Sequence, residues 1–596
     1  MMDSKPSAIL ASPLDLLRSE LAARNLAGFV VPRADEHQGE YVPPSAKRLA
    51  WLTGFTGSAG VAVVLGDAAA VFSDGRYTLQ LREEVDAARF QLLHLTEDPP
   101  AAWIRRTAKP GDRIGYDPWL HTAADVRRLS EAARAAGADM VACAGNPLDA
   151  VWSDRPLPPT AEAAPYPVDV SGRVGLDKQR EVAAALEREG DDAAVLTLPD
   201  SIAWLLNVRG RDLPCTPVVL SFAIVYRDAT VDWFVEPGKV GDAVRAHLGV
   251  GVRVRPRDAF VPVLRELGAR GAAVRVDPAS GPAAVAEILA EAGAKVVSAA
   301  DPCLLPKACK NAVELDGFRR AHRSDAAALA RFLAWFETHG AGQSEKALAD
   351  RLLAFRMEQP GFVCPSFPTI AGAGPNGAIV HYHVRAETAR VLEPGQLFLL
   401  DSGAHYRDGT TDVTRTLALG EVDPAIRRNF TLVLQGHIDL AQAVFPKGTT
   451  GSQLDALARR WLWAEGLDYD HGTGHGVGAF LSVHEGPQRI GKAPSAVALE
   501  PGMVLSDEPG YYKTGAYGIR IENLLAVRAV EGGEQPMRGF ETLTLAPIDR
   551  RLVVAEMLLP EQRDWLNAYH ERVAEVVAPL VDAATARWLE EATRPI

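Results

Sequence analysis

Two aspartates in the segment LLDSGAHYRDGTTDVTRT, residues 399–416, stand where a carboxylate is unusual. Asp401 directly follows an apolar run and Asp412 lies among residues that favour strands, although aspartate is depleted in strands and a buried, unpaired carboxylate is costly. The Asp-Gly pair between them is a turn signal, so we expect a hairpin centred between Tyr406 and Arg407 that places the two aspartates opposite each other. Opposed residues lie about 4.5–5.5 Å apart at Cβ, where like charges repel. The segment therefore predicts either a cation between the carboxylates or a solvated edge hairpin.

Three later segments carry more side chains that could bind a metal. HGTGHGVG supplies His471 and His475 among glycines, which let the backbone approach whatever the imidazoles touch. LSDEPGYY places Glu508 at a strand end, and GIRIENLLAV places Glu522 on the same strand face as Arg520. Each segment also has an ordinary structural explanation: a turn histidine, a loop glutamate, or an ion pair on an exposed sheet face.

The candidate metal ligands have a combined charge that limits the number of ions. Four carboxylates and one neutral imidazole carry a charge of −4, which two divalent cations would neutralise; the five are Asp401, Asp412, His475, Glu508 and Glu522. Oxygen-rich ligation with one nitrogen favours Mn²⁺, with Co²⁺, Zn²⁺ or Fe²⁺ as further choices. Paired ions about 3.5–4 Å apart can share one hydroxide and clamp an oxygen of the reacting group.

Composition restricts the class of protein. The 596 residues exceed one core, with 47% hydrophobic and 23% charged residues, and we expect a multidomain globular protein. The net charge of −13 and the lack of a clustered basic face argue against nucleic-acid binding. Five widely spaced cysteines suit a reducing compartment. Without an apolar signal region or a run long enough to cross a bilayer, the sequence predicts a cytoplasmic protein that does not bind membranes.

The first half of the chain reads as an α/β pattern that occurs twice. Strands and helices alternate up to a helix near 122–136, and the proline-rich segment 153–169 follows, where a packed element is not expected. The tripeptide Ala-Trp-Leu at 50–52 recurs at 203–205, each time followed by a pair of strands. We therefore predict two copies of one α/β domain, over residues 1–160 and 161–310.

The remaining residues, 311–596, also carry an internally doubled pattern. A helix with Ala326, Leu329, Phe332, Leu333 and Phe336 at helical spacing opens this section. SEKALADRLLAF at 344 resembles SQLDALARRWLW at 452, and each follows a long helix and precedes a segment with histidines. A pseudo-twofold domain of this kind would place a site between its halves. Two closing helices are predicted after residue 558.

Taken in order, the motifs DSG, DGTTDVTRT, HGTGHGVG, HEGP, SDEPGYY and GIRIEN resemble those of the pita-bread metallopeptidases. Within that family they are similar to the long, three-domain cytosolic form of Xaa-Pro aminopeptidase, also called aminopeptidase P. The resemblance covers essentially the whole chain. It implies two creatinase-like α/β domains followed by a pita-bread catalytic domain, and a homodimer formed through that last domain.

The resemblance also implies roles for single residues. Asp401 would be a terminal ligand of one metal, Asp412 and Glu522 would bridge two metals, and His475 and Glu508 would complete the second. The substrate-binding residues would be His381, His471, His484 and Arg520, and the catalytic residues would be Glu508, His471 and His484. His383 departs from the pattern expected after His381-Tyr382.

The implied activity is removal of the N-terminal residue from peptides with proline at the second position, by attack of a hydroxide that bridges the two metals. Proline requires a dedicated pocket because its nitrogen carries no hydrogen and its ring restricts the backbone. Glu508 would move the proton to the leaving nitrogen. One alternative is a prolidase that cleaves only Xaa-Pro dipeptides. Another is a metal-free pita-bread module that binds proteins, although such modules lose the ligands that this sequence keeps.

Overall fold

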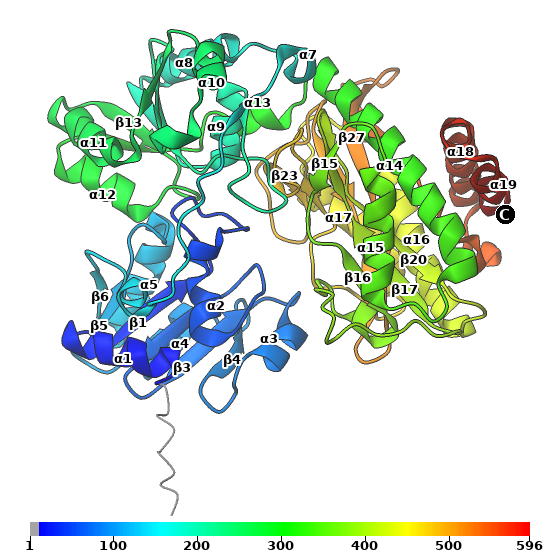
Figure 1. Cartoon of the computed structure of the whole chain (residues 1–596), viewed down its shortest axis with the longest axis horizontal. Helices are drawn as coiled ribbons and strands as arrows, with labels where there is room; N and C mark the ends of the chain where they lie inside the picture. Colours follow the sequence, from blue (N-terminus) through cyan, green and yellow to red (C-terminus); the bar gives the residue numbers. More distant parts are fainter. Residues whose placement is uncertain (1–10) are drawn as a thin grey trace, which may run out of the picture.

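The computed structural model describes residues 11–596, and Figure 1 shows two smaller α/β domains beside a larger third one. The first, domain I, has one six-stranded sheet with the order β4-β3-β2-β1-β5-β6. Helices α1 (Pro13–Ala23), α4 (Pro100–Thr107) and α5 (Ala123–Ala135) accompany it. Its strands are β1 (Gly28–Pro32), β2 (Val61–Leu65), β3 (Ala69–Ser73), β4 (Gln91–His94), β5 (Arg113–Tyr116) and β6 (Asp139–Ala142).

Domain II repeats this topology. Its sheet has the order β12-β11-β10-β8-β13-β14, and each neighbouring pair is parallel or antiparallel as in domain I. The predicted duplication is therefore confirmed. Helix α8 (Gly175–Glu189) comes first in this domain. Helix α9 (Pro199–Leu206) contains the repeated Ala-Trp-Leu, and a pair of strands follows it. The strands are β8 (Ala193–Leu196), β10 (Phe222–Tyr226), β11 (Val231–Phe234), β12 (Val252–Arg255), β13 (Ala273–Val276) and β14 (Lys295–Ser298).

The segment between the two domains is mostly irregular, as its prolines predict. It holds only the two-residue strand β7 (Ala164–Pro165), which pairs with β9 (Val208–Arg209), and the first two residues of α7 (Val168–Ser171).

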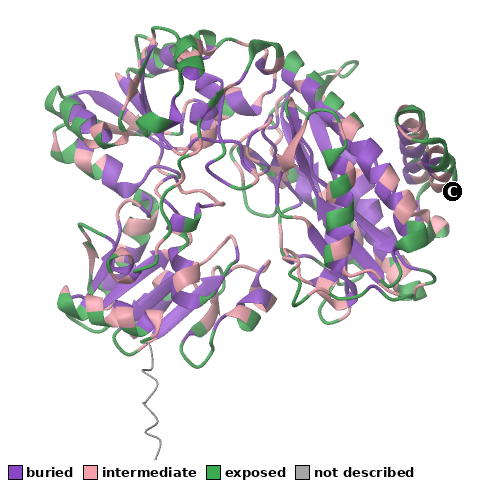
Figure 2. Ribbon diagram, in the orientation of Figure 1, coloured by how far each residue is buried: buried purple, intermediate pink, exposed green. Residues whose placement is uncertain are grey.

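The third domain is built from two similar halves, as the sequence predicted. Helix α14 (Ala312–His339) packs on α15 (Glu345–Met357), and α16 (Pro424–Ala441) packs on α17 (Gly451–Ala464). All five apolar positions predicted for the first helix are buried, and Figure 2 shows that the strands beneath the helices are buried too. Helices α18 (Pro560–Val577) and α19 (Ala583–Ala592) close the chain. No helix within residues 11–596 is long and apolar enough to cross a membrane.

The hairpin that carries the two aspartates corrects one prediction. Strands β17 (Leu397–Ser402) and β20 (Val413–Ala418) pair so that Asp401 lies opposite Thr414, two residues from the expected partner. The turn is centred one residue later because Tyr406 is 1% exposed and its hydroxyl donates to Asp325 at 3.0 Å, which keeps Tyr406 in β18 (Ala404–Tyr406).

Asp412 and Asp401 nevertheless remain on one face of the hairpin, as diagonal neighbours. The two aspartates are 3% and 7% exposed, respectively, so the solvated edge hairpin is excluded.

Candidate metal centre and the cavity around it

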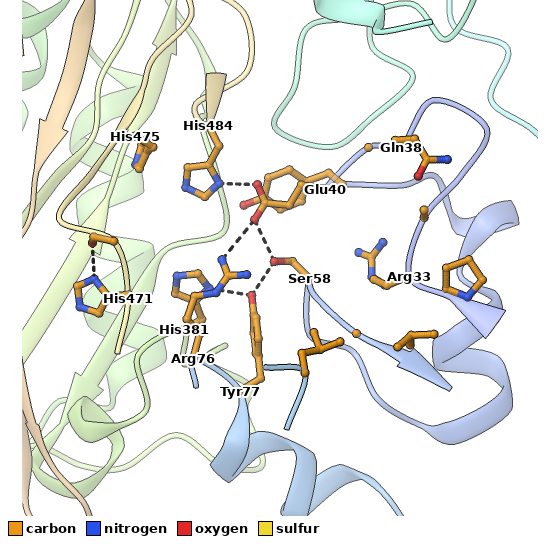
Figure 3. A pocket seen from close by; sticks show the side chains of 18 of the residues that line it. Arg33, Gln38, Glu40, Ser58, Arg76, Tyr77, His381, His471, His475 and His484 are labelled. Atoms are coloured by element: carbon orange, nitrogen blue, oxygen red, sulfur yellow. Dashed lines mark hydrogen bonds and ion pairs between the residues drawn. The ribbon is translucent and has the colours of Figure 1, made fainter. Parts of the chain in front are cut away.

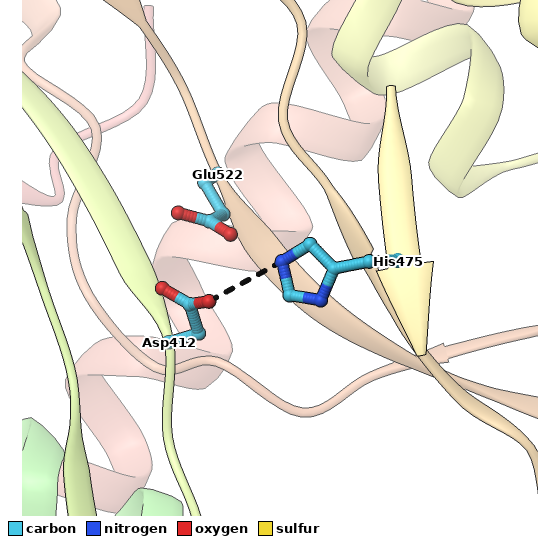
Figure 4. A group of neighbouring side chains, drawn as sticks. All are labelled: Asp412, His475 and Glu522. Atoms are coloured by element: carbon cyan, nitrogen blue, oxygen red, sulfur yellow. Dashed lines mark ion pairs between the residues drawn. The ribbon is translucent and has the colours of Figure 1, made fainter. Parts of the chain in front are cut away.

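Three of the predicted ligands meet directly. One ligand atom from each of Asp412, His475 and Glu522 lies within 4.8 Å of the others, and Figure 4 shows the three side chains converging from separate parts of the third domain. His475 stands on β22 (Gly474–Gly476), and Glu522 lies between β26 (Tyr517–Arg520) and β27 (Asn523–Val530). The His475 Nε2 atom is 3.5 Å from Asp412 Oδ2. The group thus joins the first half of the domain to the second.

The other two predicted ligands border this group. Glu508 follows β24 (Val504–Asp507), and its Oε1 lies 3.6 Å from His475 Nε2. Asp401 stands near the end of β17, where its Oδ2 accepts a hydrogen bond of 2.6 Å from Arg520 Nη2. All five predicted ligands line one cavity of about 780 Å³.

The charges of these groups favour a bound cation. Burial raises the pKa of Glu522 well above its usual range, and the charges of Asp412, Asp401 and Glu508 add to that shift. Burial likewise raises the pKa of Glu508 to about 7, against the opposing charges of His475 and Arg520. Carboxylates held this close are stable as anions only when positive charge lies among them.

His475 is oriented for metal ligation. Its Nδ1 is 3.0 Å from the Gly476 carbonyl oxygen, which can only accept, so Nδ1 carries the proton of the neutral ring. The lone pair on Nε2 then faces Asp412 and Glu508. Although burial opposes the charged ring, the hydrogen bond to Asp412 and the charge of Glu508 raise the pKa of His475 to about 9, so a bound metal would take the place of a proton on Nε2. A carbonyl that orients a histidine in this way is the usual support of a metal-bound imidazole.

Unpartnered oxygens complete the fit to a metal. Among the side chains of residues 11–596, Asp401 Oδ1 and Asp412 Oδ1 are buried without a hydrogen-bond partner. Buried polar atoms are otherwise nearly always bonded. The donor set of four carboxylates and one imidazole therefore fits the divalent cations expected from the sequence.

The predicted substrate histidines lie on the cavity wall, each with a side-chain partner. His381 Nδ1 is 2.7 Å from the Tyr77 hydroxyl, and His471 Nε2 is 2.8 Å from the Tyr512 hydroxyl. His484 Nδ1 is 2.5 Å from Glu40 Oε2, as Figure 3 shows.

His383 and Arg520 are the two remaining residues that the sequence singled out. His383, whose role the sequence left open, also lines the cavity. Arg520 differs: it is 1% exposed, lies behind the carboxylates, and donates to Asp401 and to the Tyr512 hydroxyl rather than lining the cavity.

Domain I supplies residues that the sequence did not indicate. Figure 3 shows Glu40, Ser58, Arg76 and Tyr77 of domain I beside His381 and His484. Ser58 Oγ donates to Glu40 at 2.9 Å and lies 2.7 Å from the Tyr77 hydroxyl. The available signal was weak, because Glu40 and Tyr77 are more than 300 positions from the histidines that they contact.

Domain II contributes no cavity residue but supports the loop that carries His484. None of residues 161–310, all of which are described, lines the cavity. Glu485 is instead held by two buried lysines: Lys307 Nζ at 2.9 Å from Oε2, and Lys310 on Oε1. Lys307 also contacts Asp200 of α9 at 2.6 Å. The residue next to His484 is therefore fixed by a buried ionic cluster.

Comparison with known families assigns each part of the chain. Residues 13–150 and residues 154–314 each match a family model described as the Creatinase/Prolidase N-terminal domain. Residues 316–529 match Metallopeptidase family M24, and residues 536–596 match the C-terminal region of peptidase M24.

Full-length relatives are also found. The chain is 39% identical to a probable Xaa-Pro aminopeptidase P of Paracoccidioides brasiliensis, over 97% of this chain and 98% of the relative. It is 41% identical to aminopeptidase P2 of Arabidopsis thaliana, over 95% and 86%. Its structure superposes on X-prolyl aminopeptidase from Caenorhabditis elegans, described as a cytosolic enzyme with a di-nuclear active site, with a TM-score of 0.94, 35% identity, and coverage of 98% and 99%.

Proposed function

The chain belongs to the aminopeptidase P family within the M24 metallopeptidases, and on that premise we propose that it removes the N-terminal residue from peptides with proline at the second position. The observation that carries the proposal is the convergence of five metal-ligand side chains in one cavity. The similarity over nearly the full length of its relatives supports the same activity.

We assign two divalent ions, with Mn²⁺ as the expected native metal, to Asp401, Asp412, His475, Glu508 and Glu522. When bound, the ions supply an activated water and an electrophile for the carbonyl oxygen of the scissile bond.

Proton transfer falls to Glu508. Its Oε1 lies 3.6 Å from His475 Nε2 within the ligand group, so the carboxylate would be placed to accept a proton from the attacking water and deliver it to the leaving proline nitrogen. The acidic cavity also suits the free α-amine of the substrate, which limits cleavage to the first peptide bond.

We propose different roles for His471 and His484. His471 Nδ1 lies 2.8 Å from the Gly472 carbonyl oxygen and so carries the ring proton, which makes Nε2 an acceptor for the Tyr512 hydroxyl. His471 therefore lines the pocket, with both ring nitrogens bonded to protein groups. His484, whose Nδ1 is turned to Glu40, is the better candidate to steady the substrate carbonyl. We propose that Arg520 positions Asp401 and Tyr512 instead of binding substrate directly.

Other expectations remain proposals. The family matches support domain boundaries near residues 160 and 310. Similarity to the cytosolic enzyme of Caenorhabditis elegans supports a cytoplasmic location. A homodimer formed through the third domain is expected from the family resemblance, and sedimentation of the purified chain would test it.

The decisive experiment combines metal analysis with hydrolysis of an Xaa-Pro-Pro peptide. We expect about two ions per chain and efficient cleavage in the wild type, and a loss of roughly 100-fold or more in Asp412→Asn. Asp408→Asn is the matched control, because Asp408 lies in the same hairpin but bonds to Arg320 outside the cavity.

Two outcomes would contradict the proposal. Full activity in a sample stripped by a chelator would exclude the metal mechanism. Cleavage of Xaa-Pro dipeptides alone would favour the prolidase alternative.

A further inference from the structure

The cavity that holds the metal ligands extends into domain I. Its lining there includes Arg33, which follows β1, and Leu120 and His121, which follow β5. Strands β1 and β5 are adjacent and parallel, and the chain reaches β5 only after building β2, β3 and β4 on the other side of β1. Ligands of α/β sheets bind outside the carboxyl ends of strands at such a reversal of strand order.

Arg33 presents an unused hydrogen-bond donor at this end of the cavity. Its Nε donates to the Gly57 carbonyl oxygen at 3.1 Å. Its Nη1 is buried, and no side chain or backbone group of residues 11–596 accepts a hydrogen bond from it. Figure 3 places Arg33 on the domain I wall, across from His471 and His475. A buried guanidinium nitrogen without an acceptor is costly unless a ligand supplies one.

His121 presents the complementary acceptor. The ring is 3% exposed, and its Nδ1 lies 3.0 Å from the Asp117 carbonyl oxygen. Because that carbonyl can only accept, Nδ1 carries the proton and Nε2 carries the lone pair. Burial lowers the pKa of His121, which keeps the ring neutral. Nε2 is buried and has no partner in the described part of the chain.

We propose that Arg33 and His121 form a subsite for the peptide main chain beyond the proline: Arg33 donates to a carbonyl or terminal carboxylate oxygen, and His121 accepts a hydrogen bond from a peptide N–H. The inference rests on the proposed function, since it assumes that the substrate is held at the metal ligands.

Proline chemistry makes the subsite selective. The proline nitrogen carries no hydrogen once it is in a peptide bond, so the N–H that His121 accepts comes from a residue after the proline. A dipeptide has no such residue. Each additional residue extends a chain by about 3.3–3.6 Å, so the subsite is reached only above a certain peptide length. The same enzyme would thus prefer longer peptides to Xaa-Pro.

The test is a length series measured on metal-loaded protein. The substrates are Ala-Pro, Ala-Pro-Ala, Ala-Pro-Ala-Ala and Ala-Pro-Ala-Ala-Ala, each as the free acid and as the C-terminal amide. We expect kcat/KM of the wild type to rise at one length by roughly five- to tenfold, the effect of one or two hydrogen bonds. A rise confined to one free acid assigns the ligand of Arg33 as a terminal carboxylate, and a rise shared by acid and amide assigns it as an internal carbonyl.

Variants separate binding from folding. Arg33→Met and His121→Phe should abolish the rise, and Arg33→Lys should restore part of it. The Asp117 carbonyl keeps a hydrogen bond from the Leu120 amide at 3.0 Å when His121 is replaced. Arg18→Met is the matched control, because Arg18 Nε also donates to a domain I carbonyl, that of Leu65 at 3.2 Å, but lies outside the cavity.

A second readout does not depend on catalysis. Calorimetric titration with Pro-Ala-Ala-Ala, the leaving peptide, should show weaker binding to Arg33→Met than to Arg18→Met. An unchanged length dependence and unchanged peptide binding in both Arg33→Met and His121→Phe would overturn the inference. Failure of the wild type to cleave any peptide in the series would instead count against the proposed function.

Discussion

Domains I and II have the same strand order but different relations to the catalytic domain. Domain I meets it through side chains that also line the cavity, such as the partly exposed Glu40 on His484 and the buried Tyr77 on His381. Domain II meets it through buried contacts away from the cavity. Duplication of a fold has therefore produced one copy that faces substrate and one copy that supports the site.

Arg209 illustrates the supporting contacts. This domain II residue is 5% exposed and donates to the carbonyl oxygens of Phe480 at 2.6 Å and Ala479 at 3.0 Å. Both carbonyls belong to the loop that leads to His484. The comparison predicts that changes in domain II contacts reduce stability, whereas changes in the domain I wall reduce catalysis.

The largest effect should come from Glu485→Gln. This substitution leaves Lys310 without its buried carboxylate and Lys307 with Asp200 alone, which should lower the free energy of unfolding by about 3–5 kcal/mol. Urea unfolding measures the change, with Glu187→Gln at an exposed position of α8 as control.

Adding Lys310→Met should recover part of the loss, because the unpaired charge is then removed. If Glu485→Gln were as stable as the wild type, the ionic cluster of Glu485, Lys307 and Lys310 would not stabilise the protein as proposed.

The next effect concerns Lys178, which is 1% exposed in domain II. Burial lowers the pKa of Lys178 to about 7, whereas an unfolded lysine titrates near 10.4. Between these values the unfolded chain binds more protons, so stability rises with pH. We expect Lys178→Met to remove roughly 2 kcal/mol of the rise in stability between about pH 7 and pH 9.

Calorimetric scans at several pH values measure this difference. Lys295→Met, at an exposed position of β14 in the same domain, should keep the dependence of the wild type. Identical pH profiles for wild type and Lys178→Met would show that Lys178 is not the group responsible.

A smaller effect, on catalysis alone, is expected from Tyr77→Phe. The substitution removes the hydroxyl that holds His381 and Ser58 at 2.7 Å, so kcat/KM should fall between about twofold and tenfold. Tyr226→Phe is the domain II counterpart, because its hydroxyl donates to Asp232 at 2.9 Å away from the cavity. Equal losses of activity in the two variants would contradict the division between the domains.

The smallest effect should be that of Glu40→Gln. The Glu40 side chain is 28% exposed, and a partly exposed ion pair contributes only about 0–1 kcal/mol. Glutamine can still accept from His484 Nδ1, so kcat should fall by less than about fivefold. Steady-state kinetics measures it. A loss of several hundredfold would mean that Glu40 takes part in the reaction itself.

Local patterns in the sequence were sufficient for much of the architecture. The repeated Ala-Trp-Leu and its strand pair predicted two equal domains, and helical spacing predicted the buried face of α14. Residue types and order also identified a group of carboxylates and histidines that the fold brings to one cavity. These features depend on short stretches of chain, in which side-chain period and polarity are informative.

Contacts between distant segments were not predictable in the same way. The register of the aspartate hairpin depends on Tyr406, which Asp325 of α14 retains in its strand. The partner of Arg520 is Asp401, 119 positions away, and not its neighbour Glu522. Tyr77 and His381 are 304 positions apart. Such pairs depend on tertiary packing, which local propensity does not predict.

The ionic cluster at Glu485 has a consequence for how peptides enter. Lys307 and Lys310 tie the stretch between domain II and the third domain to the loop of His484, so these two domains share a buried, rigid junction. Domain I has no comparable buried ion pair with the third domain among the described residues; its link between Glu84 and Arg385, like that between Glu40 and His484, is partly open to water. If the cavity opens to admit a long peptide, we expect domain I to move, while domain II and the third domain keep their relative positions.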